Sequence, residues 1–318
     1  MYAVENKIYD LPLKPENVHW GYYDPGLKPV LSIESGSTVQ IETIVARGLQ
    51  RLKDGGVPDE DIPDALKKID LEVTERVGAH PLTGPIYIKD AEPGDTLAVR
   101  IINIEFLHPY GVAWFVPQLG TLPDDFPYTR FKVLPIDTKN NTANFGSGVT
   151  LKLAPFFGSI GVAPAAGRVP SGPPGTHAGN IDNKQLVAGS TLYIPVQVRG
   201  GLISFGDGHA IQGDGEVILS ALETSLRGTV RIFLQKGKDL EWPHAETPTH
   251  YITMGMHPDL DEAARLATRQ MVSFLVSRKG LSRDDAYFLC SMAVDLHVTQ
   301  LVNGPKGVHA MVVKSIFR

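Results

Sequence analysis

The chain has little cysteine and no long apolar run. Cys290 is the single cysteine among 318 residues, so no intrachain disulfide can form, and the chain fits a reducing compartment. No stretch approaches the roughly 18 apolar residues of a membrane-spanning helix. Residues 1–10 contain Glu5, Lys7 and Asp10 where a signal peptide needs an apolar core. These absences predict a cytoplasmic protein with no membrane partner.

Charge is also scarce. Charged residues make up 20% of the chain, below the usual quarter, and the formal net charge is −5. No Lys/Arg-rich run supplies the positive surface that a phosphate backbone requires, which excludes nucleic acid as an expected partner. The low charge content predicts much buried or shared surface. We therefore expect a homo-oligomer, either a dimer or a tetramer.

Several hydrolase and nucleotide-binding signatures are missing. The sequence contains no Gly-x-Ser-x-Gly elbow, no Ser-Ser dipeptide, no His-Glu-x-x-His, no Walker A loop and no complete Gly-x-Gly-x-x-Gly. Cys290 lies in an apolar stretch, 287–292, which is typical of a buried structural thiol rather than a catalytic one. Serine- and cysteine-dependent amidase chemistry is therefore not expected.

What the chain does have is glycine (32) and proline (24), which separate short apolar runs over the first 250 residues. The runs 29–33, 96–106, 191–198 and 228–234 predict strands of a mainly β, sandwich-like body. In the last of these runs apolar residues alternate with period two. In the run 96–106 the apolar phase shifts by one residue, which predicts a β-bulge or a strand that changes sheets.

A short pattern recurs three times. Residues 36–41, 94–99 and 189–194 all read Gly-[Ser/Asp]-Thr-apolar-x-apolar. Each predicts a tight turn that leads into a strand, with glycine free to adopt positive φ. Repeated β units explain the pattern, and coincidence among common turn residues is the alternative.

The C-terminal part has a helical period. Apolar residues recur at helical spacing over 260–275, Asp259 and Glu262 suit a capping box, and Gly280 suits a stop. Ser282 and Asp285 start a second predicted helix. Its expected buried stripe is Ala286, Leu289, Cys290, Ala293 and His297. A closing strand follows at 307–316. We predict one compact unit over 1–318, with a β-rich body at 1–257 and a helical hairpin with the closing strand at 258–318.

Two loops carry the residue types of a metal site. In the glycine-rich run 205–216, Asp207 and His209 are two residues apart and would point to one side of an extended chain, as a chelating pair must. The run 173–184 adds His177 and Asp182, with Asn180 and Asn183 as amides. The alternatives are a hairpin with solvated acids for the first run and a plain surface loop for the second.

Longer motifs resemble those of the acetamidase/formamidase family. They are 80–85, 91–95, 161–164, 177–184, 188–195, 206–216 and 246–253, in this order along nearly the whole chain. The resemblance implies hydrolysis of small amides such as formamide or acetamide, a β-sandwich-like fold and a bound metal, zinc or calcium. The sequence departs from the family at Ala178, where glycine is expected, and at 218–220, which leaves the substrate preference open.

Hydrolysis of an unactivated amide needs a nucleophile, a polarised carbonyl and a proton for the leaving nitrogen. We expect Asp207, His209, His177 and Asp182 to hold the metal, and this mixed nitrogen and oxygen set suits zinc better than calcium. The expected proton carriers are Glu216 first and Glu42 second. Asn180 and Gln212 are the expected binding groups for the amide substrate.

Two other functions stay open. One is a non-catalytic carbohydrate-binding or scaffolding β-sandwich whose loop acids hold a structural calcium. The other is an enzyme for a carbamate or a longer amide. His19, His80 and His250 stand in family-like segments, where a structural histidine is more common than a metal ligand. His297 and His309 lie in the helical and closing-strand region and are given no chemistry. Trp20 and Tyr22 or Tyr23 could line a small pocket or pack in the core.

Overall fold

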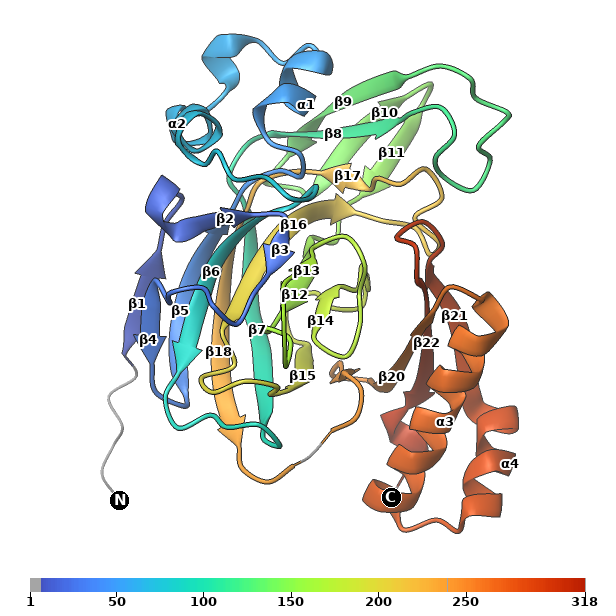
Figure 1. The fold of residues 1–318 in the computed structure, drawn as a ribbon. Coiled ribbons are helices and arrows are strands. Elements are labelled where there is room, and N and C mark those ends of the chain that lie inside the picture. Colours follow the sequence, from blue (N-terminus) through green and yellow to red (C-terminus); the bar gives the residue numbers. More distant parts are fainter. Residues whose placement is uncertain (1–6, 239, 318) are drawn as a thin grey trace.

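The computed structural model describes residues 7–238 and 240–317, and two large sheets dominate it (Figure 1). The first is nine-stranded, in the order β1 (Ile8–Leu11), β5 (Ser37–Thr43), β18 (Leu226–Gln235), β7 (Thr96–Phe106), β15 (Thr191–Pro195), β19 (His244–Glu246), β20 (His250–His257), β22 (Lys306–Val313) and β21 (Val294–Gln300).

The second sheet has eleven strands and carries the site described below. Its main path runs β11 (Val149–Lys152), β10 (Thr142–Gly146), β9 (Arg130–Asp137), β8 (Tyr110–Phe115), β17 (Leu222–Glu223), β16 (Ile203–Ile211), β12 (Phe156–Gly161) and β14 (Ala178–Asn180). A branch at β16 adds β6 (Pro81–Ile88), which pairs with β2 (Val18–Trp20) and β4 (Leu31–Ile33). A small third sheet joins β3 (Tyr22–Tyr23) to β13 (Val169–Pro170).

The two large sheets bury one shared core. Val230 and Ile232 from β18 and Val99 from β7 pack with Phe157 from β12 and Phe205 from β16 in one apolar cluster. Side chains of two sheets that interdigitate in this way define a β-sandwich. The predicted mainly β, sandwich-like class is confirmed.

The predicted strand pattern is also confirmed in detail. Val230 and Ile232 are fully buried, whereas their neighbours Thr229 and Arg231 are only partly so. In the pairing of β18 with β7, Thr229 faces Asn103 and Val230 faces Ile101, which leaves Ile102 without a counterpart and 46% exposed. Ile102 is the bulge that the phase shift in 96–106 predicts.

Each recurring turn leads into a strand of the nine-stranded sheet. Gly36, Gly94 and Gly189 have φ of 87°, 91° and 93°. Gly36 directly precedes β5, and one residue separates Gly94 from β7 and Gly189 from β15. These values lie in the region that favours glycine. The predicted turn-to-strand unit is therefore present three times.

The β-rich body contains two short helices that the sequence pattern did not predict. They are α1 (Leu49–Asp54) and α2 (Asp64–Glu72), and both lie at one end of the body, above β2 (Figure 1). Leu52, Leu66 and Ile69 pack with Trp20 and Trp114 in a separate apolar cluster. A helix of six or nine residues shows too few turns for its period to stand out. A short 3₁₀ segment at Asp59–Asp61 lies between the two helices, and another at Pro15–Asn17 precedes β2.

The C-terminal region is a helical hairpin on the end of the nine-stranded sheet (Figure 1). Helix α3 (Leu260–Lys279) begins where Asp259 accepts a bond from the Glu262 amide and ends at Gly280 with φ 70°, as predicted. Helix α4 (Arg283–Ala293) is capped by Ser282. The chain then forms β21, β22 and a final 3₁₀ turn at Lys314–Ile316.

One part of that prediction is wrong. His297 lies on β21 rather than on the buried stripe of the second helix, because α4 ends at Ala293. Residues 294–300 pair instead with β22, with His297 opposite His309. Backbone pairing with a neighbouring strand overrides a helical period of one further turn.

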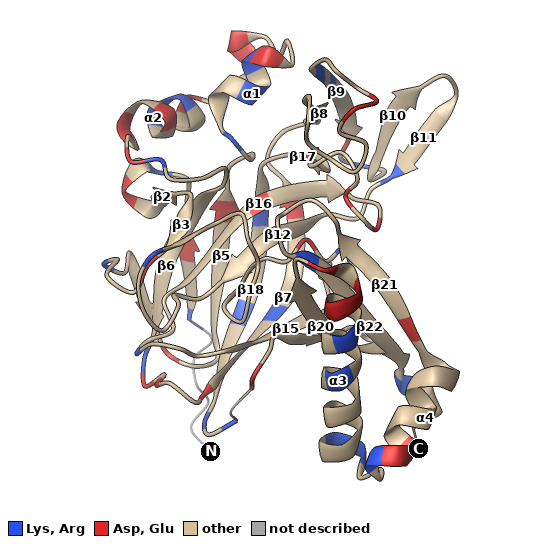
Figure 2. Cartoon of the chain, turned by 45° about the vertical axis from the view of Figure 1, so that its right-hand side comes forward, with Lys and Arg blue, Asp and Glu red and all other residues tan. Residues whose placement is uncertain are grey.

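Helices α1, α2 and α3 carry charged side chains of both signs, and in α3 the acids stand in the first turn with the bases after them (Figure 2). Helix α4 has charges in its first turn only, and the run Ala286 to Ala293 has none. Among the described helices, none combines the length and the apolar character that crossing a membrane requires.

Candidate metal centre and active site

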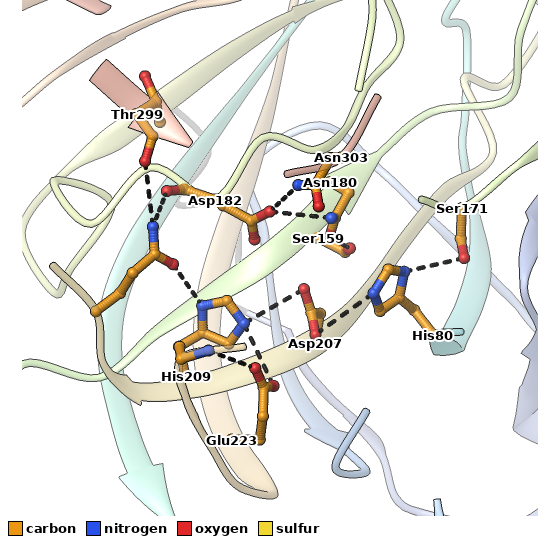
Figure 3. Close-up of polar contacts among 12 residues, drawn as sticks. His80, Ser159, Ser171, Asn180, Asp182, Asp207, His209, Glu223, Thr299 and Asn303 are labelled. Carbon is orange, nitrogen blue, oxygen red and sulfur yellow. Dashed lines mark hydrogen bonds and ion pairs between the residues drawn. The ribbon is translucent and has the colours of Figure 1, made fainter. Parts of the chain in front are cut away.

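A buried cluster of carboxylates surrounds one imidazole in the middle of the eleven-stranded sheet. Asp207 and His209 lie on β16, and the antiparallel pairing with β17 places Glu223 opposite His209. The His209 Nε2 atom lies 3.4 Å from Asp207 Oδ2 and 3.3 Å from Glu223 Oε2 (Figure 3). The three side chains are at most 4% exposed.

Two further acids complete the cluster. Asp182 and Glu216 each place a carboxylate oxygen near His209, so that the three ligand atoms lie within 4.8 Å of one another. Both residues are buried. Asp182 follows β14 and Glu216 follows β16, so the two polar loops of the sequence analysis meet at His209.

The orientation of His209 is set by Gln212. Gln212 Oε1 accepts a bond from His209 Nδ1 at 2.9 Å, and Gln212 Nε2 donates to the main-chain oxygens of Asp182 at 2.8 Å and Thr299 at 3.4 Å. This arrangement directs Nε2 at the carboxylates of Asp207 and Glu223. Metal-binding histidines commonly use a second group in this way to fix the ring.

Asp182 is held by amides. Asp182 Oδ2 accepts bonds from Asn180 Nδ2 at 2.9 Å and from Asn303 Nδ2 (Figure 3). Asn180 Oδ1 in turn accepts from Ser159 Oγ at 2.6 Å. The amides of Asn180 and Gln212 are thus engaged with protein groups. The sequence hypothesis assigned them to the substrate, whereas in the structure they position Asp182 and His209.

Burial and mutual repulsion shift the acids strongly. Burial, followed by the charges of Glu216 and Asp207, raises the pKa of Asp182 well above its usual range. Burial is also the main cause that raises the pKa of Glu223. Burial raises the pKa of Glu216 to about 8, and the charges of Glu223 and Asp207 add to this effect. Four acids thus share a site in which they cannot all ionise without a cation.

Asp207 and His209 shift in the opposite sense to what burial would give. Burial alone would raise the pKa of Asp207, but the imidazoles of His80 and His209 hold it below its usual range. Burial alone would lower the pKa of His209, but Glu223 and Asp207 raise it well above its usual value. The position between His209 Nε2 and the two carboxylates therefore attracts positive charge.

This position has the features of a divalent metal site. His209 Nε2, Glu223 Oε2, Glu216 Oε2 and Asp182 Oδ1 are buried and have no hydrogen-bond partner within residues 7–238 and 240–317. Ligand atoms about 2.1 Å from a tetrahedral zinc ion stand about 3.4 Å apart. The separations of 3.3 and 3.4 Å around Nε2 match that spacing. The residues present fit a zinc-class ion.

A glycine provides the room for this convergence. A Cβ atom on Gly158 of β12 would stand 2.5 Å from Asp207 Oδ2 and 2.9 Å from His209 Cε1, and nearer still to Asp182 Oδ1. The backbone is also strained here, because Asp182, Asp207 and Glu216 have φ of 48°, 56° and 44°. Left-handed non-glycine residues cost on the order of 1–3 kcal/mol each and cluster at functional sites.

His177 belongs to the adjoining wall of the site. Its ring meets the ring of Tyr23 edge-on, with centroids 5.1 Å apart. His177 Nε2 and the Tyr23 hydroxyl are both buried and lack a hydrogen-bond partner in the described chain. Burial lowers the pKa of His177 to about 4, so its imidazole is neutral. Burial and the charge of Asp207 both raise the pKa of Tyr23. His177 is outside both groups of metal-ligand atoms around His209.

Glu42 is not brought to the cluster. Its carboxylate accepts a bond from the Leu13 amide at 3.0 Å and pairs with Arg227 at 3.4 Å, next to β18 of the other sheet. Residues that sequence reasoning missed are Glu223 and His80. His80 Nε2 lies 3.8 Å from Asp207 Oδ1, and its Nδ1 is 3.0 Å from Ser171 Oγ (Figure 3). Only strand pairing brings them near Asp207, and a local sequence pattern does not show it.

Comparison with known proteins gives a consistent assignment. A family model described as Acetamidase/Formamidase family matches residues 11–171 and 165–318. A crystal structure of acetamidase from Bacillus halodurans is 31% identical, covers 98% of both chains and superposes with a TM-score of 0.82. The acetamidase of Mycolicibacterium smegmatis is 25% identical over 255 residues, and the formamidase of Methylophilus methylotrophus is 24% identical over 248 residues.

Each of these two matches covers 61% of this chain. The chain spans 60% of the length of the acetamidase and 58% of the length of the formamidase. The family model, in contrast, covers nearly the whole sequence, as the motifs between His80 and Thr253 predicted. The chain belongs to the Acetamidase/Formamidase family.

Proposed function

We propose that this protein hydrolyses a small aliphatic carboxamide, of the formamide or acetamide type, to a carboxylate and ammonia. The observation that carries the proposal is the cluster of four buried acids around His209, with unpartnered atoms of Asp182, Glu216, Glu223 and His209 directed into one space. The family membership and the names of the relatives support the same reaction.

Asp207, His209 and Glu223 are the residues that would hold the metal. A zinc-class ion bound there would lower the pKa of a water molecule and polarise the amide carbonyl. A mixed set of one imidazole and two carboxylates suits zinc, whereas calcium prefers oxygen ligands alone. His177, which the sequence hypothesis included among the ligands, is assigned to the substrate instead.

Glu216 is the proton carrier of this proposal. Glu216 is buried beside His209 and is not among the three residues assigned to the metal, so its carboxyl can accept and donate a proton. In the metal-free protein, burial and the charges of Glu223 and Asp207 raise its pKa to about 8. The water oxygen adds to the carbonyl carbon while Glu216 takes up a water proton. Glu216 then gives the proton to the nitrogen as the carbon–nitrogen bond breaks, and ammonia leaves. The charge of Glu216 raises the pKa of the neighbouring Asp182, so the two carboxyls do not lose their protons together.

The substrate would be held by groups whose buried polar atoms have no hydrogen-bond partner among the described residues. The Tyr23 hydroxyl can donate to the carbonyl oxygen, and the neutral His177 Nε2 can bond the amide group. The acids, His177 and His209 are each at most 8% exposed, so the site is enclosed. Enclosure favours a very small amide over a longer one or a carbamate ester.

We also propose that the protein is a cytoplasmic homo-oligomer. The outer face of α4 supports the oligomer, because Tyr287, Phe288 and Met292 are 68%, 63% and 77% exposed, and this stretch is uncharged (Figure 2). Apolar residues gathered on one surface mark contact sites between subunits.

The test is ammonia release from formamide and acetamide by Glu216→Gln beside the unchanged protein. The substitution keeps the size of the side chain and removes its proton chemistry, so kcat should fall about 10²- to 10⁴-fold. Glu246→Gln is the matched control, because Glu246 pairs with Tyr193 and Lys314 outside the cluster. Equal turnover by Glu216→Gln and the control would remove Glu216 from the reaction.

A further inference from the structure

A second group of ligand-type side chains lies beside the active site and is not used by the proposed reaction. It joins His297 on β21, His309 on β22 and Asp214 in the loop after β16. The two strands place His297 opposite His309, and their rings stack with centroids 5.0 Å apart and planes at 11°. His297 Nδ1 lies 3.3 Å from Asp214 Oδ2, and one ligand atom from each of the three residues lies within 4.8 Å of the others.

His309 is the fully buried member of this group. Its Nδ1 lies 2.7 Å from Thr299 Oγ1. Its Nε2 is buried and finds no hydrogen-bond partner among the described residues. Burial lowers the pKa of His309 to about 3, so the ring is neutral and Nε2 keeps its lone pair. One ring nitrogen fixed by a neighbour and the other free is the state of a histidine that binds metal.

The salt bridges present explain only part of the arrangement. Lys184 Nζ lies 3.0 Å from Asp214 Oδ2, the same oxygen that faces His297. Lys184 therefore neutralises Asp214 but offers nothing to His309 Nε2. A buried nitrogen without a partner destabilises the folded state. The described residues therefore leave His309 Nε2 without a ligand.

We propose that His297, His309 and Asp214 bind a second divalent metal ion of the zinc class. Two imidazole nitrogens and one carboxylate oxygen suit zinc, and they do not suit calcium or magnesium, which take oxygen ligands. Lys184 competes with this ion for Asp214. The site is separate from the cluster around His209 and does not depend on the proposed hydrolysis.

The second ion would fasten the loop that carries active-site residues. Gly215 N donates to Thr299 O at 3.1 Å, and Leu301 N donates to Gly215 O at 3.0 Å, so the loop already rests on β21. Gln212 and Glu216 lie on either side of Asp214 in this loop. A metal bond to Asp214 adds a tie between them and the β21–β22 hairpin.

The experiment counts zinc equivalents in the full-length protein. The protein is stripped with chelator and titrated with zinc, and bound metal is measured by mass spectrometry after equilibrium dialysis. Two equivalents are expected. His297→Gln, at a partly exposed position, should lose one equivalent or bind it at least about 100-fold more weakly, and His309→Gln should do the same. His250→Gln, a histidine bonded to Thr249, is the matched control and should keep both.

Lys184→Met separates a metal site from an ion-pair cluster. Removal of the competing ammonium should tighten binding of the second ion roughly fivefold, whereas a cluster held by the ion pair alone would gain nothing. Asp207→Asn should lose the other equivalent. One equivalent that disappears in Asp207→Asn and stays in His297→Gln and His309→Gln would overturn the second site and leave the proposed function intact. One equivalent that stays in Asp207→Asn and disappears in His297→Gln would support the second site and contradict metal binding at the cluster around His209.

Discussion

Gly158→Ala tests the geometry of the centre with a single methyl group. In the present structure, the added Cβ would stand 2.5 Å from Asp207 Oδ2 and 2.9 Å from His209 Cε1. To restore a van der Waals separation of 3.4 Å, the Asp207 oxygen would have to retreat by roughly 0.9 Å. Asp182 would be displaced as well, because its Oδ1 lies nearer still. Two of the four acids would therefore leave their positions around His209.

The expected cost has two parts. Overpacking of a well-packed interior costs about 1–3 kcal/mol of unfolding free energy, so Gly158→Ala should fold with a lower melting temperature. A displacement of about 1 Å at a reacting group costs about 100-fold in rate, so kcat should fall by at least that factor. Zinc affinity should fall with it, because Asp207 and His209 are assigned as ligands.

The assay follows zinc binding, thermal unfolding and ammonia release in the same preparations. Gly172→Ala is the matched control, because Gly172 has no positive φ and an added Cβ would meet nothing within 4 Å. Gly172→Ala should resemble the unchanged protein in all three measurements. If Gly158→Ala also keeps unchanged zinc affinity and turnover, Asp182, Asp207 and His209 do not form the centre described above.

In metal-free protein, the raised pKa of Glu216 means that the folded state binds more protons than the unfolded state between pH 4.5 and about 8. Unfolding free energy should therefore fall as pH rises, by roughly 3 kcal/mol between pH 4.5 and 7. Urea unfolding of Glu216→Gln should lack this share of the decline, and an identical pH profile would refute the assignment. Gln212→Ala should weaken zinc binding about 10- to 100-fold by freeing His209, as equilibrium dialysis would show, while an unchanged affinity would contradict the positioning role. Phe288→Glu should dissociate the proposed oligomer, and light scattering that gives the same mass as the parent protein would exclude α4 as the contact.

The features predictable from the sequence are those with a local signal. Period two in 229–234, the phase shift at Ile102 and the capping residues Asp259 and Gly280 each act within a few positions, and all are confirmed. Features that depend on strand pairing were not predictable. His297 is the example, because its place on β21 depends on a partner strand that follows it in the chain.

The same division holds for the site. Asp207 and His209 could be found because they are two residues apart on one strand, and Asp182 could be found because a family-like motif surrounds it. Glu223 joins them through the register of β16 with β17, which no single segment encodes. Glu42 shows the converse, since its polar position on β5 is satisfied by Leu13 and Arg227 rather than by the cluster.

The most direct test of the central claim is ammonia release from formamide, acetamide and propionamide by the purified protein, before and after chelation and with zinc or calcium restored. Turnover of the two smaller amides should be lost on chelation and recovered with zinc. No ammonia from any of the three amides, in protein shown to carry metal at Asp207, His209 and Glu223, would contradict it.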